Sequence, residues 1–229
     1  MENSFVVITN ASSGIGQELA RQFGNENLEL LICSESDEIF AVQSELEHEG
    51  HVVEAMKVNL GTYNGVENLF YRIRNYGKRL DSMVINTDSN IEGYFLDNDL
   101  RSEIKSINNN IISTIHLVKR VLTEMTERED GNILISLTSS ADAIDSANLS
   151  FIHTFVDSIR KEIKGRGVCL TLLNIDSDQE SDLEESARYA IESMRAGKGN
   201  VYPDSIIAKI HNYATRIIPE KARTHLARH

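Results

Sequence analysis

The sequence predicts an α/β fold, a doubly wound parallel sheet of about seven strands with helices on both faces. Three observations support this. Short apolar runs alternate with longer amphipathic runs along the whole chain, a glycine-containing turn follows the first apolar run, and the length of 229 residues suits one such domain. We therefore expect residues 1–229 to form a single domain without linkers or repeats.

The short apolar runs are rich in Val, Ile and Leu, which is typical of strands buried on both sides. The expected strands are residues 5–9, 28–33, 51–56, 80–86, 132–137, 167–174 and a short seventh at 201–202. Ligands of such sheets bind beyond the carboxyl ends of the strands, so these ends are where we look for a site.

Between the strands, apolar residues recur every three or four positions, which predicts helices. The expected helices are a stretch through Leu19, Ala20 and Phe23, then residues 37–49, 63–76, 98–127, 142–164, a stretch from Leu183 to Met194, and residues 204–218. In the longest helix, one apolar stripe is formed by Ile104, Ile107, Ile111, Ile115, Val118, Leu122 and Met125.

The charge of the chain argues against two classes of partner. The formal net charge is -12, and such a surface repels the phosphates of nucleic acids and of anionic lipids, so we expect neither nucleic acid nor membrane as a partner. Cys33 and Cys169 fall in apolar strands, which suits a reducing compartment. With no basic region before the first apolar run, we expect no signal peptide and a cytoplasmic location.

A candidate phosphate-binding turn lies between the first strand and the first helix. There, glycines let the backbone approach a pyrophosphate, and the helix start offers free N–H groups. The turn consists of Thr9, Asn10, Ala11, Ser12, Ser13, Gly14, Ile15 and Gly16. It resembles the Thr-Gly-x-x-x-Gly-x-Gly pattern of the short-chain dehydrogenase/reductase family. Asn10 replaces the first Gly, and Asn tolerates the positive φ that this position demands. A tight turn without ligand is the alternative.

The resemblance extends over nearly the whole chain. Asn59-Leu60 is similar to the family's Asp-Leu near the adenine, Asn86 to the first Asn of its Asn-Asn-Ala-Gly, and Asn110 to the Asn that holds a proton-relay water. The run 196–203 resembles a ketoreductase-like branch. The resemblance implies NAD or NADP, or no cofactor if the site is lost, and these cofactor-binding positions: Thr9, Asn10, Ser12, Ser13, Gly14, Ile15, Gly16, Asn59 and Asn86.

The family's catalytic positions are largely substituted. Counting back from the family-like run at residues 158–163, Asp145 stands at the Tyr of Tyr-x-x-x-Lys and Leu149 at the Lys. In the family, Tyr transfers the proton and Lys lowers its pKa, because a free Tyr titrates near pH ~10. The Ser that polarises the substrate oxygen is matched by Thr138. The resemblance thus implies Asn110 and Thr138 as kept or nearly kept catalytic positions, and Asp145 and Leu149 as substituted ones.

The nicotinamide half of the site shows further departures. Ile175-Asp176 replaces the Pro-Gly that meets the nicotinamide, Asp88 replaces a small residue, and the substrate loop is cut down to residues 177–182. Glu35, at the end of the second strand, can accept hydrogen bonds from ribose hydroxyls, which favours NAD, or it is merely solvated. We expect no metal site, because His, Cys and carboxylates show no metal-ligand spacing.

Two functions remain open from the sequence. The first is a non-catalytic binding or scaffold protein with weak or no dinucleotide binding. The second is an NAD(P)-dependent oxidoreductase, reducing a carbonyl or oxidising an alcohol with rearranged residues, for example an Asp145–His153 acid–base pair. Apolar residues on two faces of helices 98–127 and 142–164 predict a homodimer or homotetramer through these helices, or a hetero-oligomer with an active relative.

Overall fold

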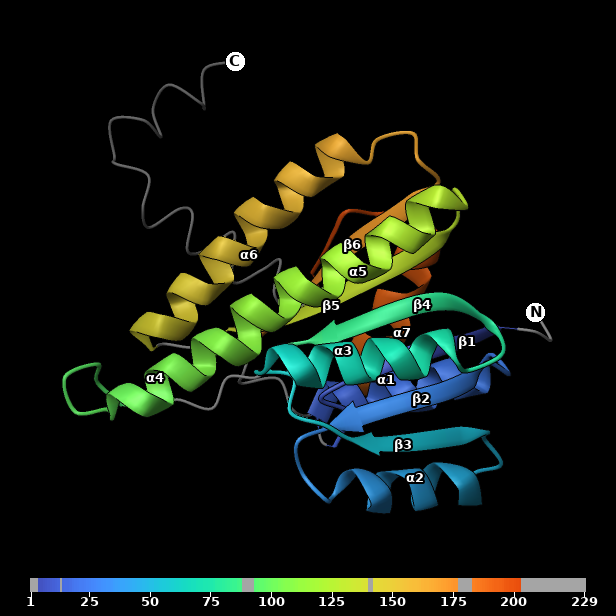
Figure 1. Ribbon diagram of the computed structural model, residues 1–229, viewed down its shortest axis with the longest axis horizontal. Coiled ribbons are helices and arrows are strands. Elements are labelled where there is room, and N and C mark those ends of the chain that lie inside the picture. Colours follow the sequence, from blue (N-terminus) through green and yellow to red (C-terminus); the bar gives the residue numbers. More distant parts are fainter. Residues whose placement is uncertain (1–3, 13, 88–92, 140–141, 177–182, 203–229) are drawn as a thin grey trace, which may run out of the picture.

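The computed structural model describes residues 4–12, 14–87, 93–139, 142–176 and 183–202. They contain one seven-stranded sheet of order β3-β2-β1-β4-β5-β6-β7, with every neighbouring pair parallel (Figure 1). The strands are β1 (Ser4–Thr9), β2 (Glu29–Ser34), β3 (Val53–Lys57), β4 (Arg79–Asn86), β5 (Gly131–Ser139), β6 (Val168–Asp176) and β7 (Asn200–Val201). The predicted doubly wound sheet is confirmed, and the first strand lies in its interior.

Helices cover both faces of the sheet. The helices are α1 (Gly14–Asn25), α2 (Ile39–His48), α3 (Tyr63–Arg74), α4 (Leu100–Ile107), α5 (Ser113–Glu127), α6 (Ala143–Glu162) and α7 (Leu183–Arg195). The core on one side takes residues from α3, α5 and α6, and the core on the other takes residues from α1, α2 and α7. The helix expected at residues 204–218 lies outside the described residues.

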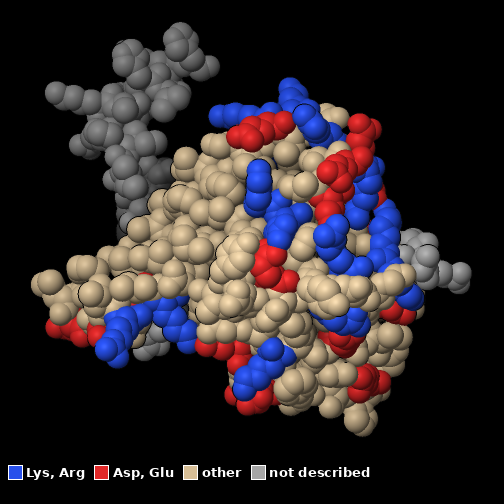
Figure 2. All heavy atoms as spheres, in the orientation of Figure 1, with Lys and Arg blue, Asp and Glu red and all other residues tan. Residues whose placement is uncertain are grey.

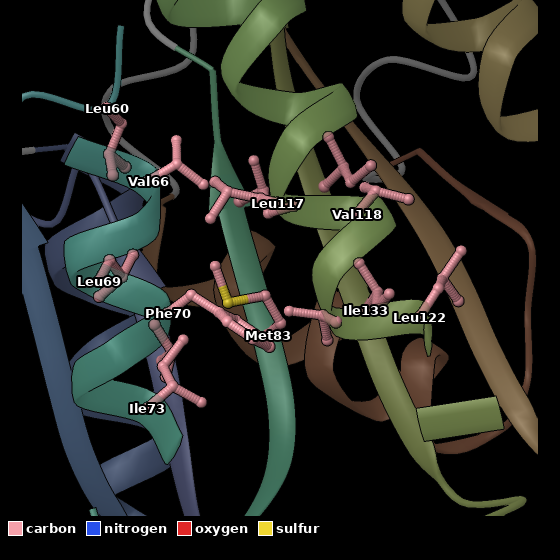
Figure 3. Close-up of a cluster of buried hydrophobic side chains, with 14 of the residues drawn as sticks. Leu60, Val66, Leu69, Phe70, Ile73, Met83, Leu117, Val118, Leu122 and Ile133 are labelled. Carbon is pink, nitrogen blue, oxygen red and sulfur yellow. The ribbon is translucent and has the colours of Figure 1, made fainter. Parts of the chain in front are cut away.

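The first of these cores holds the sheet against α3 and α5. Leu69 and Phe70 of α3, Met83 of β4, Leu117 of α5 and Ile133 of β5 belong to this cluster, and Figure 3 shows Phe70 extending toward Met83. All five side chains are almost completely removed from solvent. Burial of this kind stabilises each large aliphatic or aromatic side chain by roughly 1.5–3 kcal/mol. The strand ends that line the site are therefore anchored in a well-packed core.

A π-helical turn, η1 (Asn108–Ile112), joins α4 to α5 in one continuous rod. It corrects the predicted apolar stripe, because Ile104 is 49% exposed whereas Glu103, Ser106 and Asn110 are buried. A π turn inserts one extra residue, which rotates the preceding helix by about one position relative to the following one. The face of α4 that is turned inward is consequently polar.

Among the helices that the structure describes, none combines the length and the apolar character that a membrane crossing requires.

Candidate functional site

The turn between β1 and α1 is tightly built around Asn10. Asn10 adopts a φ of 47°, as its tolerance of the left-handed region predicts, and its Nδ2 donates to the carbonyl oxygen of Asn86 at 2.8 Å. Gly14 also has positive φ, at +57°. Gly16 packs so closely that a Cβ there would lie 2.4 Å from the carbonyl oxygen of Asn10. The turn therefore requires glycine at Gly16 and holds its shape without a glycine at Asn10.

Asn86 ties three neighbouring strands together at their carboxyl ends. Its Nδ2 donates to the carbonyl oxygen of Thr9 at 2.6 Å, and its backbone N–H donates to the Thr9 hydroxyl at 3.1 Å. Its Oδ1 accepts from Ser136 Oγ at 2.5 Å. Because Asn86 is buried and its amide is bonded on both sides, the floor between β1, β4 and β5 is rigid.

A pocket of about 610 Å³ opens over this floor. It extends from the ends of β1 and β2, past the end of β4, to the inward face of α4 and η1. Its lining consists of Asn10, Ser12, Gly14, Ile15, Gly16, Ser34, Glu35, Ser36, Glu38, Val58, Leu60, Asn86, Thr87, Ser102, Lys105, Ser106, Asn109, Asn110 and Thr138. The volume suits a small organic ligand.

Most of the expected cofactor-binding positions lie in this lining. Asn10, Ser12, Gly14, Ile15, Gly16 and Asn86 all line the pocket. Thr9 lies behind it, bonded to Asn86, and Ser13 falls outside the described residues. Asn59 stands at the rim, where its Nδ2 donates to Glu35 Oε1 at 2.8 Å and its Oδ1 accepts from the Gly61 N–H at 2.9 Å.

An ion pair spans one end of the pocket. Lys105 Nζ, on α4, lies 3.0 Å from Glu35 Oε2, beyond the end of β2. Both side chains are substantially exposed, so the pair itself stabilises the fold little, by roughly 0–1 kcal/mol. No pattern in the sequence indicates that these two residues meet.

Four buried polar side chains meet between α4, η1 and α6. Ser106 Oγ donates to Asp145 Oδ1 at 2.9 Å. The same hydroxyl oxygen accepts from Asn148 Nδ2 at 3.0 Å and from Asn110 Nδ2 at 3.2 Å. Asp142 caps α6 by accepting from the Ile144 and Asp145 N–H groups, which fixes Asp145 in the first turn of the helix.

Two of the expected catalytic positions, Asn110 and Asp145, belong to this cluster, but the four positions do not converge on the large pocket. Asn110 and Thr138 line the pocket, whereas Asp145 and Leu149 do not. The gap that Asp145 and Leu149 do line, with Thr138 and Asn110 opposite, is only about 10 Å³. Such a space is at the lower limit for a single water molecule. A ligand in the large pocket is thus separated from the Asp145 carboxylate.

The two members of the suggested Asp145–His153 acid–base pair have other partners. His153 Nε2 lies 2.8 Å from Asn174 Oδ1, on β6, whereas Asp145 Oδ1 accepts from Ser106. Asp88 and residues 177–182 lie outside the described residues. Within the described ranges no group of His, Cys, Asp and Glu is arranged to hold a metal ion.

Three residues of the site escaped the sequence analysis. Ser106 and Asn148 complete the buried cluster, and Lys105 reaches across the pocket. Ser106 lies one helical turn before Asn110 and Asn148 nearly one turn after Asp145. Polar residues one helical turn from two suspected site residues lie on the same helix face, and this spacing could have indicated that they belong to the site.

Comparison with known proteins places the chain in a family. Residues 4–185 match the family model described as short chain dehydrogenase. The chain belongs to the short chain dehydrogenase family. This is an oxidoreductase family, and the seven-stranded sheet described above is the fold of its solved structures.

Among relatives of this short chain dehydrogenase, oxidoreductase UcpA of Salmonella typhimurium is 32% identical over 138 residues, which are 60% of this chain and 52% of UcpA. The match therefore spans about half of that relative's length. A bulky-bulky ketone specific alcohol dehydrogenase from Comamonas testosteroni superposes with a TM-score of 0.79 at 15% identity, covering 95% of each chain. A metagenomic short-chain oxidoreductase in complex with NADP gives 0.75 at 17% identity, covering 87% of this chain and 96% of that one.

Proposed function

We propose that this chain is a short chain dehydrogenase family member without dehydrogenase activity, a pseudoenzyme that acts as a binding or scaffold protein. It holds an adenine nucleotide in the large pocket only weakly.

The burial and the hydrogen bonding of Asp145 are the main support for a loss of dehydrogenase activity. The resemblance places the family's proton-transferring Tyr here, yet the Asp145 side chain is only 3% exposed and accepts a hydrogen bond from Ser106. A carboxyl group bonded to Ser106 does not reproduce a phenol whose pKa a neighbouring Lys has lowered. Leu149, at the Lys position, supplies no charge. The chain therefore presents no proton donor of the family type at this place.

The pocket fits one part of a nicotinamide cofactor and not the other. The close approach of Gly16 to Asn10 and the start of α1 form a cradle suited to a pyrophosphate. Such a cofactor, when bound, supplies or accepts a hydride. At the opposite end, Ser106, Asn110 and Thr138 form the wall, and the acid–base position lies behind it. This chain's residues can hold an adenosine diphosphate group but do not position a proton for transfer.

Calorimetric titration of the purified protein with NAD and with NADP tests this function. We expect affinities weaker than low-micromolar for both dinucleotides, because the wall formed by Ser106, Asn110 and Thr138 does not bind the nicotinamide. Low-micromolar affinity for either dinucleotide would overturn the proposed loss of the site. The competing function is that of an oxidoreductase with rearranged catalytic groups, which would use Asn110 and Thr138. It would be detected as enzyme-dependent turnover.

We also propose that the protein assembles through α4, α5 and α6, as a homodimer or homotetramer or with an active relative. Ile104 on α4, Ile112 at the end of η1 and Phe151 on α6 are between 43% and 51% exposed. Phe151 and Phe155 stack with ring centroids 6.0 Å apart. Figure 2 shows few charged side chains over much of α6, whereas both signs of charge crowd the side of α3 and the end of α5. Exposed apolar side chains gathered in this way are typical of protein interfaces.

The cysteines support a cytoplasmic location. Cys33 and Cys169 are both free, and burial raises the pKa of the Cys33 thiol to about 12. Unpaired thiols persist in a reducing compartment such as the cytoplasm.

A further inference from the structure

The short helix α4 is packed with a polar face inward and an apolar face outward. Glu103 and Ser106 are buried, whereas Leu100 and Ile104 are exposed to solvent. A helix at a protein surface usually has the opposite arrangement, in which the apolar stripe faces the core and the charged residues face water. The orientation of α4 is therefore not the one that its own apolar residues favour.

The buried carboxylate of Glu103 is the least favourable feature of this arrangement. Within the part of the chain that the structure describes, neither of its oxygens has a hydrogen-bond partner. Burial of a carboxylate without such partners costs free energy. Ser106, on the same face, is by contrast bonded to Asp145, Asn110 and Asn148. The present orientation thus satisfies Ser106 and leaves Glu103 unsatisfied.

The π turn η1 gives α4 a second orientation. A π turn contains one residue more than an α turn, so its conversion to an α turn rotates α4 by one residue position, or about 100°. Ile104 and Ile107 would then occupy the places of Glu103 and Ser106. Asp145 would lose its bond from Ser106 while Glu103 left its buried place. Because each register deprives one carboxylate of a favourable environment, the two registers lie close in free energy.

The rotation would also change the charge of the pocket wall. In the present register α4 and η1 contribute Ser102, Lys105, Ser106 and Asn109 to the lining. A shift by one position would bring Glu103 to the place of Ser102 and Ser106 to the place of Lys105. The wall would exchange an ammonium group for a carboxylate, which repels the phosphates of a nucleotide. An anionic ligand therefore favours the present register.

We propose that α4 exchanges between two registers about η1 and that an anionic nucleotide in the pocket selects the register in which Glu103 is buried. Shifts of helix register take microseconds to milliseconds, so the exchange is fast compared with a binding measurement. The selection rests on the nucleotide-holding role proposed above, whereas the exchange itself depends only on the packing of α4.

Two substitutions outside the pocket lining test the selection through the affinity for 5′-ADP, measured by calorimetry. Glu103→Leu removes the buried carboxylate of the present register, and Ile104→Glu places a carboxylate where only the shifted register would bury it. Both should raise the affinity, by about twofold if the registers are equally populated. Glu192→Leu, at an exposed position of α7, should leave it unchanged. Since the two substitutions change the net charge in opposite directions, affinities that move in opposite directions would overturn the proposal.

A fluorescent probe follows the register itself, because the chain contains no tryptophan. In Ile104→Trp, addition of 5′-ADP should shift the emission to longer wavelength as the indole moves toward solvent. Adding Glu103→Leu to this variant should cause the same shift without any ligand. Tyr71→Trp, on the exposed side of α3, is the control and should respond to neither change.

Emission from Ile104→Trp that responds neither to 5′-ADP nor to Glu103→Leu would show a single register and overturn the proposal. Absence of 5′-ADP binding would refute the nucleotide-holding role and with it the selection. The response of the emission to Glu103→Leu would then still decide whether α4 has two registers.

Discussion

Ser106 on α4 donates a hydrogen bond of 2.9 Å to Asp145 on α6, at the place where the family resemblance puts the proton-transferring residue. The bond exists because the π turn η1 rotates the polar face of α4 inward, toward the first turn of α6. The Asp145 carboxylate there also benefits from the positive end of the α6 dipole. A position that serves chemistry in the family thus serves the contact between two helices in this chain.

Asp145→Ala should destabilise the protein by about 1–3 kcal/mol, because it leaves the buried Ser106 hydroxyl without its acceptor. Urea unfolding of the variant and the wild type measures the difference. Asp157→Ala, at an exposed position of the same helix, is the control and should change the unfolding free energy by less than about 0.5 kcal/mol. An Asp145→Ala protein as stable as the wild type would show that the Ser106 bond contributes nothing.

Gly16→Ala should weaken binding of 5′-ADP, because the added Cβ would lie 2.4 Å from the carbonyl oxygen of Asn10 and 2.9 Å from Asn86 Nδ2. The turn must shift to relieve these contacts, at a cost of roughly 1–3 kcal/mol in stability. Gly197→Ala is a matched replacement: φ is +72° there, no heavy atom lies within 4 Å of the added Cβ, and the position does not line the pocket. If both variants bound 5′-ADP equally well, the glycine turn would not be part of the binding site.

Glu67 on α3 should make stability depend on pH in acid. Hydrogen bonds from the Arg120 guanidinium, and secondarily from His116, lower the pKa of Glu67 from 4.5 to about 2. A depressed pKa in the folded state contributes stability above pH 4.5 and loses that contribution as the pH falls toward 2. The difference in unfolding free energy between wild type and Glu67→Gln should therefore shrink over this window. A difference that stays constant from pH 7 to pH 2 would argue against the Arg120–Glu67 contact.

The proposed assembly predicts that the wild-type protein scatters light as a dimer or tetramer. Phe151→Glu should shift it toward the monomer, because a charge would be buried in the interface. Phe40→Glu, a similarly exposed Phe on α2, should leave the assembly intact. A wild-type monomer at high micromolar concentration would exclude self-assembly and leave only assembly with a relative.

The sequence predicted the sheet well because its signals are local. Each buried strand is a short run of Val, Ile and Leu, and alternation with helices suffices to indicate a parallel doubly wound sheet. The positive φ of Asn10 in the turn could also be predicted, because the tolerance of Asn for positive φ is a property of a single residue.

The polar character of the inward face of α4 could not be predicted from the sequence in this way. A regular helical period places Ile104 with Ile107 and Ile111, but η1 adds a residue and turns Ser106 inward instead. The contacts of Ser106 with Asp145 and of Lys105 with Glu35 join segments that are 39 and 70 residues apart. No periodicity within one segment indicates such pairs, and they follow only from the packed arrangement of the helices.

A turnover assay decides whether this family member acts as a dehydrogenase. Purified protein is mixed with NADH or NADPH and a panel of aldehydes and ketones, and with NAD or NADP and the corresponding alcohols, while the nicotinamide absorbance is followed. We expect no change above the rate without protein, because Asp145 is buried behind the pocket wall and Leu149 supplies no charge. Saturable turnover that is abolished by Thr138→Ala or Asn110→Ala would show that the protein is an active dehydrogenase.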